Sequence, residues 1–399
     1  MPTQLFCFAW MEGGTTLSLP LSAQSKEILP ENSGSDSEEN SHTFNNSTRG
    51  RKMKTKMTLY LLGMFLMTVV ARGQTIDWAT HLYASGSAIG NVATADRDGN
   101  YYVAGFFTGN MNFGGSTNLS GAGFGDLYIA KYGPDRSLRW ARSGNSDGWN
   151  GGRGIAIDSS SNVLVAGRIE GTTNFNGKSV TGVGENDVVL VKYSSSGEVQ
   201  WVKSAGGSGM DWGNGVAVDA QGNSYVVGYF SGTATFGTQQ VTSAGNYDIF
   251  IASYSPNGDV RWVKSAGGSG QDEGYGVGVD AAGDVYITGI AIGNINFGST
   301  SFSGGTKGGF VAKYGADGTF KWVKGSAGSN TVESISISQG GIFIGGAFSG
   351  SLTLGGQTVT SAGAEDVYVA RYTPLGSAEA LWRLGGTGSD GTAGFGQAV

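Results

Sequence analysis

Three glycine-rich connections in this chain place an aromatic side chain close to carboxylates. They read GNSDGWNGG around Trp149, GGSGMDWGNG around Trp212 and GGSGQDEGYG around Tyr275, and two of them contain Asp211 and Asp272. An aromatic ring can cover the apolar face of a sugar, and a carboxylate can accept hydrogen bonds from its hydroxyl groups. We therefore predict that Trp149, Trp212, Tyr275, Asp211 and Asp272 form one surface that binds a carbohydrate or a protein ligand. The alternative is that these turns only seal one end of the fold.

Few residues in the chain are suited to acid–base or metal chemistry. His81 is the only histidine after residue 73, so neither a Ser-His-Asp triad nor a histidine metal site can be assembled from that region. Acidic turns such as DRDGN, residues 96–100, superficially resemble calcium loops but lack the further ligands and the terminal glutamate of an EF-hand. Asp, Gly and Asn are also the residues that a tight turn selects. We predict no catalytic residues, no metal and no cofactor.

One further motif resembles a known functional element and fails the comparison. The segment GADGTFKW, residues 315–322, is similar to the Asp box of sialidase-type propellers, but Asp317 and Gly318 are adjacent where the box separates these two residue types. No arginine cluster for a carboxylated sugar is evident in the sequence. The segment is therefore interpreted as a turn.

Tryptophans recur along the chain at a nearly constant interval. Their steps are 62, 61, 61, 60 and 60 residues, which is the signature of a repeat architecture, and the residues are Trp78, Trp140, Trp201, Trp262, Trp322 and Trp382. Recurrent tryptophans can hold a quinone cofactor or stack on carbohydrate. A large ring that returns once per repeat among apolar neighbours, as in RWVK, favours packing between repeats.

Each repeat is predicted to contain four strands and no helix. The third copy reads GNGVAVD, QGNSYVVGYF, YDIFIASY and RWVKSAGG, with period-two alternation and many β-branched or aromatic residues. The turns DAQGN and SPNGD join these strands, and their Gly and Asn tolerate the positive φ of tight hairpins. The chain is therefore expected to be all-β.

A four-stranded unit of about 60 residues fits one blade of a β-propeller. First strands such as GIAID and GVAVD carry only Gly or Ala on one side, as a crowded strand near a central axis requires. Third strands such as DLYIAKY are apolar on both faces, so both faces must be covered. A β-solenoid is the rival architecture, but its coils normally use roughly 20–30 residues.

The recurring frame resembles the SBBP repeat family of bacterial secreted β-propellers. The residues that carry the resemblance are GNSYVVGYFSGTATFG and DIFIASYSPNGDVRWVKSAGGSGQDEG, and it extends from Trp78 to Val399. Two departures are local, because Gly308 stands in a column of aspartates and Ser338 replaces a turn aspartate. The resemblance implies an extracellular propeller, and it implies neither a defined activity nor catalytic residues.

The spacing also predicts how many blades the chain contains. We expect five complete blades plus the start of a sixth, formed by Gly394 to Val399, in a ring truncated from six or more blades. Trp78 has no preceding blade of its own and would complete the last blade of the ring. The resemblance further implies a C-terminal sorting domain in the parent protein. The expected blades are residues 91–146, 153–207, 213–268, 274–327 and 333–386.

The first 73 residues differ in character from the repeats. Residues 57–70, MTLYLLGMFLMTVV, form an apolar core preceded by lysines and followed by the small residues Ala71 and Gly73. This order is typical of a secretory signal peptide, and the apolar run is short for a membrane span. We predict a signal peptide at 53–73, a disordered leader or upstream translation at 1–52, and a propeller domain at 74–399 that is secreted and spans no membrane after cleavage.

Composition limits the remaining partners. The only cysteine, Cys7, lies outside the predicted mature chain, which excludes disulfides and thiolate chemistry there. Residues 74–399 hold 18 Lys plus Arg and 25 Asp plus Glu, a net charge of −7 that disfavours nucleic acid.

The function that these features favour is a secreted, non-enzymatic propeller that acts as a binding or surface-display scaffold. One alternative is a glycan-active or quinone-dependent enzyme whose catalytic residues lie outside this sequence, and another is a purely structural spacer. A cluster of Arg, Glu and Tyr that converges on the mouth of the central channel would favour the enzyme. A channel lined by Gly, Ala and Val would favour the scaffold.

Overall fold

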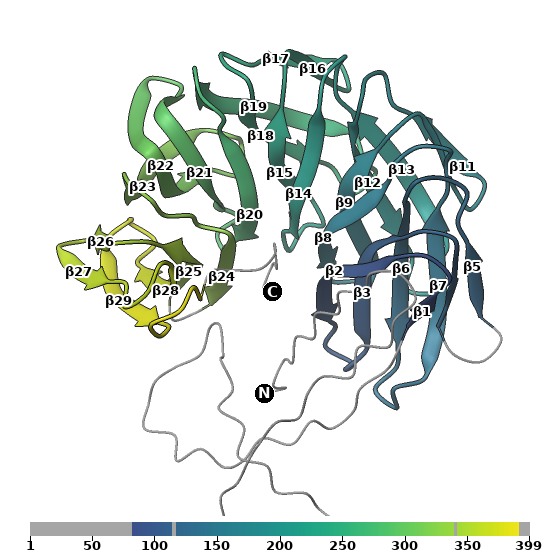
Figure 1. Ribbon diagram of the computed structural model, residues 1–399. Helices are drawn as coiled ribbons and strands as arrows, with labels where there is room; N and C mark the ends of the chain where they lie inside the picture. Colours follow the sequence, from purple (N-terminus) through teal and green to yellow (C-terminus); the bar gives the residue numbers. More distant parts are fainter. Residues whose placement is uncertain (1–81, 114–116, 339–340, 391–399) are drawn as a thin grey trace, which may run out of the picture.

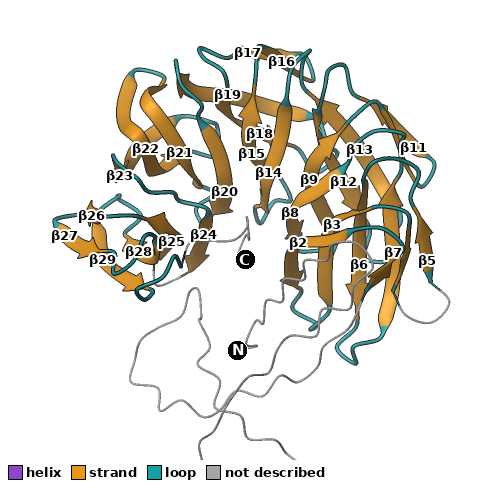
Figure 2. Ribbon diagram, viewed as in Figure 1, coloured by secondary structure: helices purple, strands orange, loops and turns teal. Residues whose placement is uncertain are grey.

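The computed structural model describes residues 82–113, 117–338 and 341–390, and within them the chain is built from strands without helices (Figure 2). None of the described segments is a helix long and apolar enough to cross a membrane. The predicted leader and signal peptide, Trp78, His81 and Gly394 to Val399 lie outside the described residues.

Most strands belong to antiparallel sheets of four strands, each formed from one repeat in the order first, second, third, fourth strand. The first sheet contains β2 (Ala88–Ala95), β3 (Tyr101–Phe107), β6 (Asp126–Tyr132) and β7 (Leu138–Gly144), and the second contains β8 (Gly151–Ile157), β9 (Val163–Ile169), β12 (Asp187–Tyr193) and β13 (Val199–Ala205). The third sheet contains β14 (Asp211–Val218), β15 (Ser224–Phe230), β18 (Asp248–Tyr254) and β19 (Val260–Gly268), and the fourth contains β20 (Glu273–Val279), β21 (Val285–Phe297), β22 (Thr300–Tyr314) and β23 (Phe320–Ser326). The fifth sheet contains β24 (Ser334–Ser338), β25 (Gly341–Phe348), β28 (Asp366–Tyr372) and β29 (Ala378–Leu384).

Short hairpins extend from the sheets between the second and third strands. In the fourth sheet the hairpin is continuous with the long strands β21 and β22, and β21 also pairs with the end of β19, which joins the third and fourth sheets. The remaining short strands are β1 (Tyr83–Ala84) with β4 (Asn110–Asn112) and β5 (Asn118–Ser120), β10 (Thr172–Phe175) with β11 (Lys178–Thr181), β16 (Thr233–Phe236) with β17 (Gln239–Thr242), and β26 (Ser351–Leu354) with β27 (Gln357–Thr360).

The sheets follow one another along an arc, with the first strands β8, β14, β20 and β24 toward its middle (Figure 1). Successive first strands contact one another, and the small residues predicted there are required. A Cβ on Gly154 would lie only 2.8 Å from the backbone nitrogen of Val216 in the next sheet. The prediction of an all-β chain of small antiparallel sheets is confirmed.

Third strands form the core, since every residue of β6, β12 and β18 is buried. Both faces of each strand are covered, as the sequence predicts. Clusters such as Leu164, Leu190, Val226 and Phe250 join side chains of neighbouring sheets. The hydrophobic interior is therefore divided into layers between sheets.

Four of the recurring tryptophans hold neighbouring sheets together. Each indole Nε1 donates a hydrogen bond to a carbonyl in the last turn of the next sheet: Trp140 to Ser195 at 3.1 Å, Trp201 to Pro256 at 3.0 Å, Trp262 to Ala316 at 2.9 Å and Trp322 to Pro374 at 3.3 Å. The interpretation of these rings as packing between repeats is confirmed. Trp382 belongs to the fifth sheet and is 42% exposed.

The acidic turns are used as hairpin caps. Asp219 Oδ1 accepts hydrogen bonds from the backbone nitrogens of Gln221 and Asn223, and its Oδ2 accepts one from the Tyr225 hydroxyl. The turns at Asp96 and Asp280 repeat this pattern. These carboxylates are therefore engaged by the turn itself, as turn chemistry predicts.

Candidate functional site

The three predicted aromatic residues occupy different positions of the repeat. Trp149, Trp212 and Tyr275 follow the recurring tryptophans of their own repeats by 9, 11 and 13 residues. Trp149 precedes β8, Trp212 pairs with Tyr229 between β14 and β15, and Tyr275 lies in β20. The prediction that they occupy successive connections between sheets is wrong for Trp212 and Tyr275, which the strands include.

The predicted carboxylates do not belong to the surface. Asp211 and Asp272 are fully buried. Asp211 Oδ2 accepts a hydrogen bond from the Gly207 backbone nitrogen at 2.7 Å, and Asp272 accepts hydrogen bonds from Gly268 and Ile292 at 2.9 Å each. The prediction that Asp211 and Asp272 face a ligand is therefore wrong. Successive side chains of an extended segment point in opposite directions, and these two point into the loop that they stabilise.

Burial changes the protonation of both carboxyl groups. It raises the pKa of Asp211 to about 7, and the nearby Asp187 adds to the shift. Burial raises the pKa of Asp272 to about 6, with smaller contributions from Asp248 and Glu273. The two groups therefore titrate near neutral pH as parts of the fold.

Trp149 and Trp212 do come together, and an arginine lies between them. The guanidinium carbon of Arg168, in β9, is 4.3 Å from the centre of the Trp149 ring and 3.7 Å from that of the Trp212 ring. Arg153, in β8, places its guanidinium carbon 4.5 Å from the Trp212 ring centre. Both indole rings are half-buried. The arrangement joins the second and third sheets.

Aromatic side chains continue this arrangement in both directions. Phe106 of the first sheet lies 4.6 Å from Trp149, and Tyr229 lies 5.5 Å from Trp212, measured between ring centres. Tyr229 in turn lies 5.2 Å from Tyr247. We refer to the whole set as the arginine–aromatic ladder: Phe106, Trp149, Arg153, Arg168, Trp212, Tyr229 and Tyr247.

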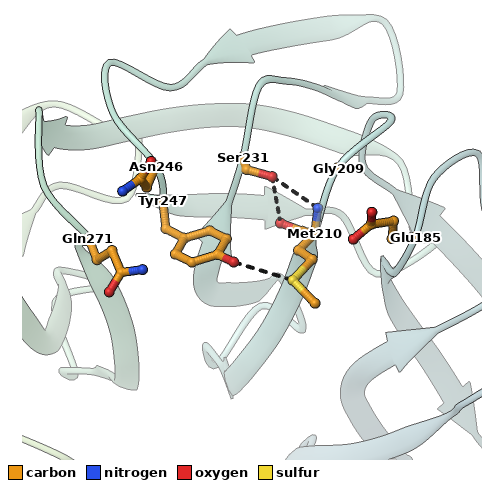
Figure 3. A pocket seen from close by; sticks show the side chains of 7 residues that line it. All are labelled: Glu185, Gly209, Met210, Ser231, Asn246, Tyr247 and Gln271. Atoms are coloured by element: carbon orange, nitrogen blue, oxygen red, sulfur yellow. Dashed lines mark hydrogen bonds between the residues drawn. The ribbon is translucent and has the colours of Figure 1, made fainter.

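An open pocket of about 470 Å³ adjoins the Tyr247 end of the ladder (Figure 3). The Tyr247 hydroxyl donates a hydrogen bond to the sulfur of Met210 across it, at 3.3 Å. The lining is mainly polar and consists of Glu185, Gly209, Met210, Ser231, Asn246, Tyr247 and Gln271. The ladder and this pocket span three neighbouring sheets at the edge where first strands begin and second strands end.

The two guanidinium groups influence each other. Burial, and to a smaller extent the positive charge of Arg153, lowers the pKa of Arg168 to about 10, and Tyr229 and Glu170 oppose the shift. Burial also lowers the pKa of Arg153, against the effect of Tyr229, Glu273 and Tyr275. A pKa of about 10 still leaves Arg168 charged at neutral pH.

Tyr275 is placed beside Glu273, away from the predicted surface position. Its hydroxyl donates a hydrogen bond to Glu273 Oε2 at 2.9 Å, and the side chain is only 8% exposed. Burial and the Glu273 charge raise the pKa of Tyr275 well above its usual range. Tyr275 also interacts electrostatically with Arg153.

Sequence reasoning missed Arg153, Arg168, Tyr229 and Glu273. Arg153 lies at a β-bulge between Gly152 and Gly154, and a bulge redirects a side chain. The same bulge position holds Asn91 and Asn214, whose amide nitrogens each donate 2.8 Å hydrogen bonds to a carbonyl of the next sheet. The sequence did contain a signal for both arginines. When the repeats are aligned, the positions of Arg153 and Arg168 hold other residue types in the remaining repeats.

No group of three or more His, Cys, Asp or Glu side chains in residues 82–113, 117–338 and 341–390 is arranged to hold a metal ion. The ladder offers two cations and aromatic faces instead. Its chemistry suits the binding of a ligand that combines negative charge with flat apolar surfaces.

Comparison with known proteins supports the repeat. Residues 200–229, which contain Trp201 and most of β15, match the family model for the SBBP beta-propeller repeat, and this confirms the resemblance seen in the sequence. An uncharacterized WD repeat-containing protein of Acanthamoeba polyphaga mimivirus is 25% identical over 251 residues, which cover 53% of this chain and 18% of that protein.

Two further comparisons are weaker. Regulatory protein FlaEY of Caulobacter vibrioides is 28% identical over 129 residues, or 31% of this chain and 13% of that protein. The chain thus spans less than a fifth of the length of both curated relatives. A crystal structure of a protein of unknown function from Bacteroides caccae shares 11% identity over 50% of this chain and 90% of its own, with a TM-score of 0.20.

Proposed function

We propose that this chain is a secreted, non-enzymatic β-propeller that acts as a binding module, with the arginine–aromatic ladder as its ligand-facing surface. One observation carries the proposal: a half-buried guanidinium, Arg168, is held between two indole rings at 4.3 and 3.7 Å. Packing between sheets does not require this arrangement, because the recurring tryptophans already provide contacts from each sheet to the next. The sheets are taken to be propeller blades.

Export rests on the residue order around the apolar core at 57–70. A mature chain that begins at Gln74 would place the repeats outside the cell. N-terminal sequencing of exported protein checks this, and an exported chain that retains residues 1–52 would contradict it.

The binding proposal is tested with the double variant Trp149→Ala, Trp212→Ala on arrays of carbohydrates and extracellular proteins. We expect the wild-type chain to be retained on a subset of array members and the double variant to lose about tenfold or more in affinity, because an aromatic contact contributes roughly 0.5–1.5 kcal/mol per ring. Trp382→Ala is the matched control, since it removes an exposed indole outside the ladder.

Both ladder indoles are half-buried, so retention is measured below the melting temperature of the double variant and after its β-sheet circular dichroism is checked. Unchanged retention by a folded double variant would refute the ladder as the surface. A wild-type chain that binds nothing on the arrays would favour the structural spacer.

A glycan-active enzyme is the second candidate, and one observation favours it. Arg153 interacts electrostatically with Tyr229, Glu273 and Tyr275, and the Tyr275 hydroxyl donates a hydrogen bond to Glu273 at 2.9 Å, so that Arg, Glu and Tyr side chains are grouped beside the ladder. First strands nevertheless carry the Gly, Ala and Val expected of a scaffold, and glycoside hydrolysis usually requires two carboxylates across the bond. Release of new reducing ends from a bound saccharide, abolished by Glu273→Gln, would establish the enzyme.

A further inference from the structure

Arg168 differs from other arginines of the sheets in its ionic partners. Arg142, Arg371 and Arg383 each form an ion pair with a carboxylate, at 3.1, 3.1 and 2.8 Å. Arg168 has no such ion pair with the part of the chain that the structure describes. The Arg168 guanidinium instead contacts the indole rings of Trp149 and Trp212.

Arg153 is a second cation near Arg168, and bringing the two positive charges together costs electrostatic free energy. Arg153 and Arg168 contact the same Trp212 ring, from β8 and β9, and each is partly withdrawn from water. Two like charges in a desolvated site disfavour each other's charged form. Glu170 acts on Arg168 and Glu273 acts on Arg153 to offset part of this cost, and a ligand that supplies negative charge at this position would offset more of it.

The guanidinium carbon of Arg168 lies within cation–π distance of both indole rings, at 4.3 and 3.7 Å from the ring centres. A guanidinium that covers an aromatic ring with its planar face keeps its N–H groups in its own plane, where they can bind an oxyanion in a bidentate manner. Tyr229, which is buried, and Tyr247 connect the ladder to the polar pocket. The two arginines and this pocket together suit a ligand that carries an anionic group beside several hydroxyl groups.

We propose that Arg153 and Arg168 bind the acidic group of an anionic polysaccharide, a uronate or a sulfate ester, while the polar lining of the adjoining pocket contacts its sugar hydroxyl groups. This inference rests on the proposed binding function and specifies its ligand class. The predicted mature chain carries a net charge of −7, so polyanions are repelled in general and recognition has to come from this local pair.

Affinity gel electrophoresis of the repeat domain tests the inference. The gels contain polygalacturonate, its fully methyl-esterified form, dextran sulfate or neutral dextran. We expect retardation in polygalacturonate or dextran sulfate and none in the two uncharged polymers. Which of the two acidic gels retards the chain more distinguishes carboxylate from sulfate ester.

Variants locate the acidic group. Arg168→Gln is expected to raise the dissociation constant for the acidic polymer by about tenfold or more, as loss of a charge-assisted bidentate contact predicts. Arg168→Lys keeps the charge without the planar fork and should recover part of the affinity. Arg142→Gln is the matched control, because Arg142 also lies over an indole, that of Trp140, but already pairs with Glu198.

The outcomes separate the two proposals. One outcome is retention in neutral dextran that Arg168→Gln leaves unchanged and the double tryptophan variant abolishes. This outcome would overturn the acidic ligand but would leave the proposed binding function standing. Absence of retardation in every gel, together with no ligand on the arrays, would overturn both. Equal retardation by single-stranded DNA would show general polyanion attraction and would overturn the saccharide. If Arg168→Gln unfolds, Arg153→Gln replaces it with the same expected loss.

Discussion

At the scale of single residues, the same position serves different purposes in successive repeats. Asn150, Asp211, Asp272 and Asn330 occupy one column at the start of the first strands. Asn150 donates to Ser146 Oγ at 2.7 Å, and Asn330 Oδ1 accepts a hydrogen bond from the Gly309 nitrogen at 2.8 Å. An amide therefore fulfils the structural role that a buried carboxyl group has in the neighbouring sheets.

This column leads to a prediction about pH. The pKa of Asp211 is about 7 in the folded chain, above the ordinary value of 3.8, so between about pH 4 and pH 7 the folded state binds a proton that the unfolded state releases. The free energy of unfolding must then fall as pH rises through this window. Asp211→Asn should remove that fall and be more stable than wild type at pH 8, by on the order of 1–4 kcal/mol.

Urea unfolding at pH 5 and pH 8 measures the effect. Asp317→Asn is the control, because Asp317 is exposed and hydrogen bonds from the backbone nitrogen and the hydroxyl of Thr319 lower its pKa, so this carboxyl group stays ionised at both pH values. If the free energy of unfolding changed with pH in parallel for wild type and Asp211→Asn, the buried carboxyl group would ionise without a free-energy cost. That result would contradict the prediction.

At the scale of elements, the tryptophan strand of one sheet and the last turn of the next form a repeated contact. Gly258 lies in the turn after β18, with φ of 82°, and a Cβ there would meet the Trp201 ring of the previous sheet at 2.9 Å. Glycine is needed for two reasons, the left-handed backbone and the close approach of the ring. Gly197, Gly318 and Gly376 repeat both features.

The two requirements can be separated by mutation. Gly258→Ala is expected to destabilise the chain by about 2–4 kcal/mol, since the backbone is strained and the indole must move. Gly232→Ala is the matched control, because its φ is 69° and nothing lies within 4 Å of an added Cβ, so only the backbone cost of about 1 kcal/mol remains. Equal losses in thermal or urea unfolding would show that the indole does not restrict the turn.

At the scale of the whole molecule, each sheet is stabilised by the next along the arc. Trp262 is 7% exposed beneath the following sheet, whereas Trp382 of the fifth sheet is 42% exposed. Burial of an indole contributes to stability in proportion to the area withdrawn from water. The sheets therefore differ in how strongly their tryptophans are held.

This difference predicts unequal effects of the same substitution. Trp262→Ala should cost about 3–5 kcal/mol, as expected for removing a buried tryptophan, and Trp382→Ala should cost about 1 kcal/mol or less. Chemical unfolding followed by circular dichroism gives both values. A similar cost for the two variants would mean that a further segment or a second chain covers Trp382 in solution.

The sequence alone determined the repeat, the strands and the packing role of the tryptophans. Each of these depends on local chemistry: alternation selects strands, Gly and Asn select tight turns, and a residue type that returns every 60 to 62 positions must meet the same surroundings in each copy. The matched segment at 200–229 and the antiparallel sheets agree with that expectation.

Only the tertiary structure decided which departures from the repeat lie together. Arg153 and Arg168 are 15 residues apart and meet because β8 and β9 are antiparallel neighbours, while Trp212 reaches them from another sheet. The burial of Asp211 likewise depends on which way an extended segment turns as it enters β14. A one-residue bulge or change of direction reverses the face of a side chain, and spacing along the chain does not contain that information.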